Sequence, residues 1–297
     1  MSSLSGPFVV RARAKLNLRL EIGAAADNGL HGVRSVIADL RLADDVEFVP
    51  TRGPFEVSCE GLAVEQQRNL AWRAAMALRP ELRCWQIRLR KLIPAQAGLG
   101  GGSADAAAVL RGVSRIMETQ GVPVVDARLR MIAPLLGSDV SACLVPGLKI
   151  VEGTGERVTP FAAPAPAWGV LLLQPDARAP TAEAYERIDR MPNREPSSGD
   201  LRAVCAAYES ADLERLIPLL GNDFQTVIEE AHPPVRDARE RLLASGAAAA
   251  LLCGSGSCVV GLFETAAAAE AALGRLATGS GEWAAVTGFA DGAKDEA

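Results

Sequence analysis

A glycine-rich loop that leads directly into a helix is the feature that most constrains this chain. Residues 93–105 read Ile-Pro-Ala-Gln-Ala-Gly-Leu-Gly-Gly-Gly-Ser-Ala-Asp, and an alanine-rich run follows. Glycine lets the backbone turn sharply and brings its N–H groups close to an anion. The first turn of the helix adds unpaired N–H donors and the positive end of the helix dipole. The pattern therefore predicts a loop that holds phosphate groups.

Two common phosphate-binding patterns do not fit this loop. No Gly-Lys-Ser/Thr closes it, as the P-loop requires. The glycine spacing also differs from the dinucleotide fingerprint, and no acidic residue after a following strand supports that interpretation. A flexible connection between two elements is the alternative, because turns alone favour glycine. Ser103 either offers its hydroxyl to a phosphate or caps the helix.

The length of 297 residues suits two modest domains or one large one. An Ala/Pro stretch at residues 160–166 is typical of a linker, so we place domains at 1–158 and 159–297. Both halves mix strand and helix patterns, which predicts an α+β protein with a site between the halves. Aromatic residues make up only 4% of the chain, so the core must consist mostly of Ala, Val, Leu and Ile.

Charge and cysteine usage exclude several classes of protein. The net charge of −5 argues against a nucleic-acid or membrane-surface partner. The chain has only two histidines and lacks a Cys-x-x-Cys pair, so we expect no metal site of its own. The six cysteines are expected to be free thiols, mostly buried, in a reducing cytoplasm.

One uncharged segment, residues 242–263, approaches the length of a membrane span. Its centre reads Cys-Gly-Ser-Gly-Ser-Cys, which favours strand, loop and strand over a helix in lipid. The first ten residues also lack the basic and apolar regions of a signal peptide. We therefore expect a cytoplasmic protein without a membrane segment.

Hydrophobic periodicity predicts the remaining elements. Residues 15–22 alternate strictly, which predicts a half-buried strand with Lys15 and Asn17 on its polar face. Further strands are expected at 33–42, 46–49, 55–59, 85–90, 148–151, 168–173, 247–252, 258–263 and 283–289. Helices are expected at 69–78, 103–119, 125–136, 181–190, 199–208, 212–220, 222–231, 235–244 and 265–276.

Few side chains could take a proton from a substrate beside the glycine loop. Asp139 follows a helix and precedes an apolar run, which places its carboxylate in a sparsely solvated corner. A cap or turn aspartate is the alternative. Lys15, beside Asn17 on one strand face, either points into a cleft or lies at a solvated edge.

Three other titratable residues have simpler interpretations. Asp105, early in the helix after the loop, is the rival acid, although a carboxylate there also stabilises the helix dipole. His31 lies in an expected turn, where it contacts a ligand or is solvated. His232 precedes two prolines and is interpreted as a surface residue.

Three separated segments, residues 94–105, 137–144 and 252–261, resemble motifs of the GHMP kinase superfamily. The Ala-Lys-Leu-Asn-Leu run at residues 14–18 narrows the resemblance to the branch that acts on a cytidine diphosphate-linked methylerythritol. Gly29-Leu30-His31, Asn69-Leu70, residues 175–185 and Asn222-Asp223-Phe224 follow in the order of that branch. The resemblance spans nearly the whole chain.

The resemblance implies a fold and an activity. The N-terminal domain would resemble ribosomal protein S5 domain 2, and the C-terminal domain would be ferredoxin-like. The protein would use ATP and Mg²⁺ to phosphorylate a small-molecule alcohol, a cytidine diphosphate-linked polyol. It would act as a monomer or a weak homodimer.

The resemblance also implies roles for individual residues. Asp139 would be the base and Lys15 its partner. Asn17 and His31 would position the substrate, with Thr181 near the reacting end. ATP would contact Asn69, Pro94, Gly98, Leu99, Gly100, Gly101, Gly102, Ser103 and Ala104.

Two departures from the family lie on the substrate side. The family usually carries a tyrosine that stacks on cytosine, and this chain has Leu30 there. After Asp139-Val140 the family favours proline, and this chain has Ser141. A GHMP-type kinase with another alcohol acceptor is therefore one alternative. A nucleotide-binding paralogue without turnover is another, although Lys15 and Asp139 are both present.

Overall fold

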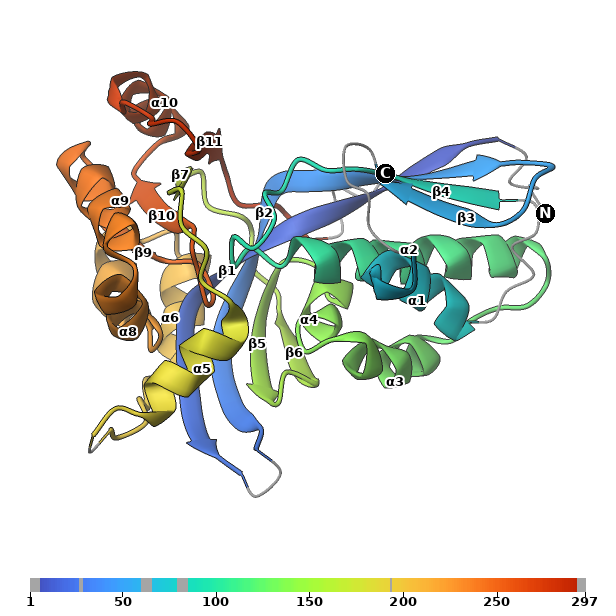
Figure 1. The fold of residues 1–297 in the computed structure, drawn as a ribbon, viewed down its shortest axis with the longest axis horizontal. Helices are drawn as coiled ribbons and strands as arrows, with labels where there is room; N and C mark the ends of the chain where they lie inside the picture. Colours follow the sequence, from blue (N-terminus) through green and yellow to red (C-terminus); the bar gives the residue numbers. More distant parts are fainter. Residues whose placement is uncertain (1–5, 27–28, 60–65, 79–84, 193, 293–297) are drawn as a thin grey trace.

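The computed structural model describes residues 6–26, 29–59, 66–78, 85–192 and 194–292. These residues form two mostly antiparallel sheets with helices packed on them, which confirms the α+β prediction. In Figure 1 the larger sheet and its helices extend to one side, and the smaller sheet lies at the other with α8, α9 and α10. The long strands β1 and β2 run past both parts.

The first sheet is built on the antiparallel pair β1 (Phe8–Ala25) and β2 (His31–Pro50). The sequence predicted two strands over the second of these segments, and the structure has one continuous strand instead. The other strands are β3 (Glu56–Cys59), β4 (Trp85–Arg90), β5 (Leu148–Gly153), β6 (Arg157–Phe161) and β8 (Gly221–Asn222). The order is β3-β4-β2-β1-β8, with β5 pairing with β2 and β6.

Helices pack against one face of this sheet. They are η1 (Gln66–Arg68), α1 (Leu70–Leu78), α2 (Gly101–Thr119), α3 (Asp126–Leu136) and α4 (Val140–Leu144). Small residues of α2 bring it close to the sheet: a Cβ on Gly112 would lie only 2.1 Å from the Phe48 ring. Ala106, Ala107 and Ala108 are fully buried, as expected for a core poor in aromatic residues.

The second sheet has the order β11-β7-β10-β9. Its strands are β7 (Gly169–Gln174), β9 (Ala249–Leu252), β10 (Val259–Phe263) and β11 (Trp283–Thr287). The helices after residue 180 are α5 (Thr181–Asp189), α6 (Leu201–Glu209), α7 (Leu213–Leu216), η2 (Ile217–Leu219), α8 (Gln225–Ala231), α9 (Pro233–Ala244) and α10 (Ala266–Arg275). The helix expected at 222–231 starts three residues later, because Gly221–Asn222 forms β8 beside β1.

The uncharged segment at 242–263 forms the end of α9 followed by the β9–β10 hairpin, which confirms strand, loop and strand. Among the described residues, no helix is long and apolar enough to cross a membrane.

Hydrogen bonds join the two sheets along β2. The backbone N–H of Arg41 donates to Gly288 O at 2.8 Å, and that of Ala290 donates to Asp39 O at 2.9 Å. Leu16 and Leu18 share one apolar cluster with side chains of the second sheet. The expected domain boundary at residue 158 lies within β6, which pairs with β5. That boundary stays a prediction.

Candidate active site

Strand β1 passes directly beside the glycine loop at Lys15. The backbone N–H of Lys15 donates to Leu99 O at 2.9 Å. Gly100 has φ 71°, and a Cβ there would lie 2.8 Å from Lys15 Cγ. Lys15 is only 5% exposed, so of the two alternatives for this side chain, a cleft or a solvated edge, the structure excludes the solvated edge. The loop covers that face, and the lysine points inward.

Neighbouring polar groups fix the direction of the Lys15 ammonium. Its Nζ donates to Asn17 Oδ1 at 2.7 Å. Asn17 Nδ2 in turn donates to Ser35 Oγ at 2.8 Å, and Ser35 Oγ donates to Arg19 O at 2.6 Å. Asn17 is itself 3% exposed. This buried chain of hydrogen bonds leaves the ammonium little freedom to turn away.

Asp139 approaches Lys15 from the other side of the site. Its Oδ2 lies 3.7 Å from Lys15 Nζ. The residue precedes α4 at the N-cap position, but its side chain accepts no capping hydrogen bond. Its side chain is 42% exposed, so the prediction that this carboxylate lies in a sparsely solvated corner is wrong. The carboxylate is therefore open to an incoming hydroxyl group.

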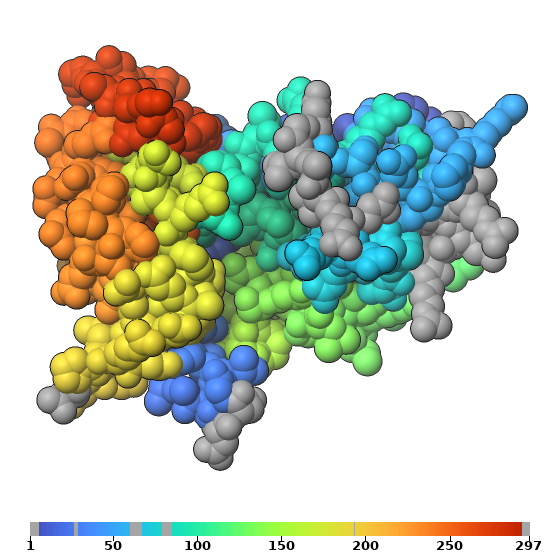
Figure 2. All heavy atoms as spheres, in the orientation of Figure 1, coloured from blue at the N-terminus to red at the C-terminus, as the bar shows by residue number. Residues whose placement is uncertain are grey.

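The glycine loop ends at the N-terminus of α2. Gly100 is the N-cap residue and Ser103 the third residue of the helix, so the N-cap interpretation of Ser103 is wrong. A Cβ on Gly137 would lie 4.0 Å from Ser103 Oγ, so the turn before Asp139 faces the start of α2. The first-turn N–H groups, which a helix leaves unpaired, thus lie on the same side as the carboxylate. In Figure 2 the surface is indented between α5 and the segments of α2 and α4.

The second Gly/Ser loop, residues 253–258, packs directly on the first. A Cβ on Gly98 would lie 1.7 Å from Cys253 O, and Ser257 N–H donates to Gln96 O at 3.2 Å. Asn222 Nδ2 donates to Gly254 O at 2.7 Å and holds this loop against β8. The loop is therefore more than a hairpin turn: it supports the glycine loop from behind.

Asn69, Leu99 and Pro94 are also predicted to contact ATP. Asn69 Oδ1 accepts a hydrogen bond from the backbone N–H of Ala71 at 2.9 Å and so caps α1. Leu99 is 1% exposed and packs in the core shared by the two sheets. Pro94 lies between β4 and the loop. Their contact with a nucleotide stays a prediction.

The sequence predicted His31 in a turn. The structure places it as the first residue of β2, so this prediction is wrong. His31 is 8% exposed, with Nδ1 3.0 Å from Gly23 O and Nε2 3.3 Å from Asp189 Oδ2. The Tyr185 ring lies 4.9 Å from the imidazole ring, centroid to centroid.

Tyr185 is the site residue that sequence reasoning missed. It lies on α5 four residues after Thr181, a spacing that puts both on one helix face. Burial raises the pKa of Tyr185, and the negative charge of Asp139 adds to that rise, which places the ring near the carboxylate. Thr181 Oγ1 lies 2.9 Å from Ser255 Oγ, at the second loop.

The remaining candidates have partners away from Lys15. Asp105 is 4% exposed and bonds to Lys91 Nζ at 2.5 Å, so it is a buried ion-pair residue. His232 Nε2 lies 3.3 Å from Glu183 Oε1 and is partly buried rather than a free surface residue. Five cysteines are free, three of them buried, and Cys84 lies outside the described residues.

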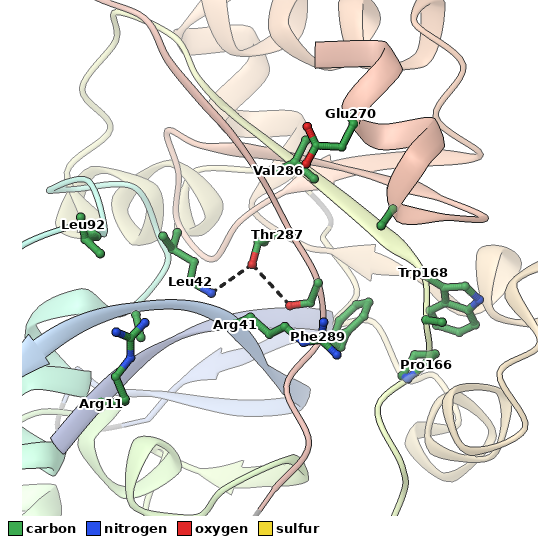
Figure 3. Close-up of a pocket in the computed structure, with 14 residues that line it drawn as sticks. Arg11, Arg41, Leu42, Leu92, Pro166, Trp168, Glu270, Val286, Thr287 and Phe289 are labelled. Carbon is green, nitrogen blue, oxygen red and sulfur yellow. Dashed lines mark hydrogen bonds between the residues drawn. The ribbon is translucent and has the colours of Figure 1, made fainter. Parts of the chain in front are cut away.

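A cavity of about 570 Å³ lies elsewhere, where β2, β11 and α10 meet. Figure 3 shows Arg11 and Arg41 on one side of it, with Trp168 and Glu270 on the others. None of the predicted site residues lines it. We place the active site by the convergence of Lys15, Asp139 and the glycine loop, since these groups can move a proton and bind phosphate.

Family comparison agrees with this geometry. The family model described as "GHMP kinases N terminal domain" matches residues 69–147, and the model described as "GHMP kinases C terminal" matches residues 202–280. The chain belongs to the GHMP kinases. These two matches cover the glycine loop, Asp139 and the second loop, the three segments that carried the resemblance.

Individual relatives of this GHMP kinase are similar over most of their length. The 4-diphosphocytidyl-2-C-methyl-D-erythritol kinase of Pelotomaculum thermopropionicum is 37% identical over 84% of this chain and 87% of that protein. The kinase of the same name from Pelobacter propionicus is 34% identical over 94% of this chain and 98% of that protein.

Solved structures show the same fold. A crystal structure of 4-(cytidine 5'-diphospho)-2C-methyl-D-erythritol kinase matches with a TM-score of 0.77 and 28% identity, over 95% of this chain and 99% of that one. Homoserine kinase from Cytophaga hutchinsonii matches with a TM-score of 0.71 and 15% identity, over 98% and 97%. At that identity the second match concerns the fold alone.

Proposed function

We propose that this GHMP kinase transfers the γ-phosphoryl group of ATP to the 2-hydroxyl of 4-diphosphocytidyl-2-C-methyl-D-erythritol. The Lys15–Asp139 pair beside a phosphate-binding loop is the observation that carries the kinase chemistry. The names of the similar proteins from Pelotomaculum and Pelobacter support this acceptor.

The reaction needs alignment and charge neutralisation more than covalent help. Asp139 accepts the proton of the 2-hydroxyl as its oxygen bonds to the γ-phosphorus. The bond from that phosphorus to the β,γ-bridging oxygen breaks, and ADP leaves with the electron pair. Lys15 stabilises negative charge on the attacking oxygen, and Asn17 keeps the ammonium in place.

The phosphates of ATP are held by N–H groups of the glycine loop and of the first turn of α2. Mg²⁺, when bound, neutralises phosphate charge, and it commonly uses few protein ligands. No group of three His, Cys, Asp or Glu side chains among the described residues could hold a metal. We propose that ATP itself brings the ion to the site, and we assign the ion no protein ligand.

The cytidine end of the substrate is proposed to lie at His31 and Tyr185. The tyrosine ring, 4.9 Å from His31, offers the aromatic face that Leu30 cannot supply. Leu30 is 53% exposed. Thr181, between this ring and Ser255, faces the reacting end. Leu30 is also the observation that favours the second candidate, a GHMP-type kinase for another alcohol.

One assay separates these candidates and the paralogue without turnover. The purified protein is mixed with ATP, Mg²⁺ and the cytidylated methylerythritol, and ADP release is followed with time. Release that depends on this alcohol supports the proposal. Release only with another alcohol, such as homoserine or mevalonate, supports the second candidate. Tight ATP binding without ADP release from any alcohol supports the third.

The remaining expectations go with this proposal. The two domains divide near residue 158, the protein acts in the cytoplasm without nucleic acid or membrane, and it is a monomer or a weak homodimer. Size-exclusion chromatography with light scattering tests the last point.

A further inference from the structure

Two buried carboxyl groups and one partly buried lysine lie together at the base of the glycine loop. Lys91 Nζ donates to Asp105 Oδ2 at 2.5 Å and also bonds to Asp44 Oδ2. Asp44 is fully buried, and Asp105 is 4% exposed. Buried charges are kept only where partners repay their lost hydration. The loop is therefore joined to the core by an ion cluster, which we name the Lys91 cluster.

The Lys91 cluster joins the two ends of the loop. Lys91 directly precedes the loop, and Asp44 Oδ1 accepts from the backbone N–H groups of Leu92 at 2.6 Å and Ile93 at 2.8 Å. Asp105 lies on α2, where the loop ends. A Cβ on Gly101 would lie 3.5 Å from Lys91 Nζ, so the ammonium also lies beside the first helical residue. One ammonium thus fixes both the entry and the exit of the loop.

We propose that Asp105 is a positioning residue for nucleotide binding, acting through Lys91 and Asp44 to hold the two ends of the phosphate loop in register. It touches no reacting atom. Its part is to keep the first-turn N–H groups of α2 aligned with the rest of the loop, because misaligned donors lose phosphate affinity. The inference rests on the proposed use of ATP, but nucleotide affinity tests it without turnover.

The charges in the cluster do not balance if both carboxyl groups are ionised. Asp44 has the Lys91 ammonium and two backbone donors, whereas Asp105 Oδ1 is buried and has no partner among the described groups. Burial raises the pKa of Asp105 to about 7, against the lowering effect of Lys91. Cys59, from β3, also faces the group, and burial raises its own pKa. Asp105 is therefore the carboxyl group that takes up a proton.

This imbalance adds a second expectation. An ionised Asp105 puts negative charge near the N-terminus of α2, where the triphosphate has to bind. Nucleotide affinity should then fall as pH rises through about 7, in addition to any effect of ATP ionisation. An asparagine at this position keeps the shape and one acceptor oxygen for Lys91 but cannot ionise.

The test compares Asp105→Ala and Asp105→Asn with Asp126→Ala, a control at the exposed first turn of α3. The dissociation constant of a non-hydrolysable ATP analogue is measured by calorimetry, and KM for ATP and kcat are measured where turnover is present. Loss of a charged hydrogen bond predicts an affinity for Asp105→Ala that is about 10-fold weaker, with kcat changed much less. Asp105→Asn should restore most of the affinity and flatten its pH profile relative to wild type.

Two results would overturn the inference. One is Asp105→Ala with a lower melting temperature but unchanged analogue affinity and KM for ATP, which would make the cluster structural only. The other is Asp105→Asn with the same pH profile as wild type. Wild-type protein that binds the analogue but phosphorylates no alcohol would contradict the proposed function and leave this test intact.

Discussion

The ammonium nitrogen of Lys15 lies 2.7 Å from Asn17 Oδ1 but 3.7 Å from Asp139 Oδ2. The shorter distance is a hydrogen bond, and the longer one is an ion pair without a direct hydrogen bond. Lys15 is thus held by Asn17, and Asp139 keeps its lone pairs available. A carboxylate in this state can accept a proton from a hydroxyl group placed between the two side chains.

Asp139→Asn should abolish the base and leave the ATP site intact. General-base catalysis contributes about 10²- to 10⁴-fold, so kcat should fall by about that factor while the affinity for an ATP analogue stays within about 2-fold. Steady-state kinetics and calorimetry check the two parts. Near-native turnover of this variant would remove Asp139 from the mechanism.

Tyr185→Leu should weaken binding of the cytidylated substrate. The ring lies beside His31, and stacking on a base is worth about 1–3 kcal/mol, so KM for the alcohol should rise about 5- to 100-fold. KM for ATP should not change. Tyr185→Phe keeps the ring and should behave like wild type, and Leu30→Ala is the control for the exposed position. Equal KM values for the Leu and Phe variants would exclude stacking by this ring.

Gly98→Ala tests the contact between the two loops. Gly98 has φ +72°, and the new Cβ would lie 1.7 Å from Cys253 O, whereas Gly121 has φ +79° with no atom within 4 Å of its Cβ. Gly121→Ala should therefore cost only the backbone strain, about 1 kcal/mol of unfolding free energy. Gly98→Ala adds overpacking of about 1–3 kcal/mol and should also weaken ATP binding. Urea unfolding and analogue titration measure both; equal losses in the two variants would argue against loop contact.

The contribution of Asp105 to the stability of the protein should fall as pH rises toward neutrality. Burial raises the pKa of Asp105 from 3.8 to about 7, so between these values the folded protein holds a proton that the unfolded chain has released. Stability from this group is therefore complete below about pH 4 and is lost as pH rises through about 7. Asp105→Asn should lack this slope in urea unfolding curves. The hydrogen bond from Arg241 lowers the pKa of Glu282 from its ordinary value of 4.5, so the contribution of Glu282 overlaps only the acid end of this window. Parallel slopes for both proteins would contradict the prediction.

The sequence predicted most elements because hydrophobic periodicity is a local property. The strand that feeds the glycine loop, the helix that leaves it and the β9–β10 hairpin were all predicted within a few residues. The continuity of β2 could not be predicted in this way. The hydrophobic pattern is interrupted between residues 42 and 46, but the strand continues there because it pairs with β1 and β4.

Burial of charged residues could not be read from alternation. Lys15, Asn17 and Glu21 occupy the polar side of a strand pattern, yet each is at most 5% exposed, because segments far away in the chain cover that face. The same applies to His31 and Tyr185, whose rings meet only after β2 and α5 pack together.

By itself, the sequence determined the family and predicted the phosphate loop and the two proposed reacting side chains, because glycine spacing and residue type are fixed by the chain alone. Only the tertiary structure decided that Lys15 bonds to Asn17, that Tyr185 provides the ring beside His31, and that Lys91 joins the ends of the loop. These relationships depend on distances between segments that no local pattern encodes.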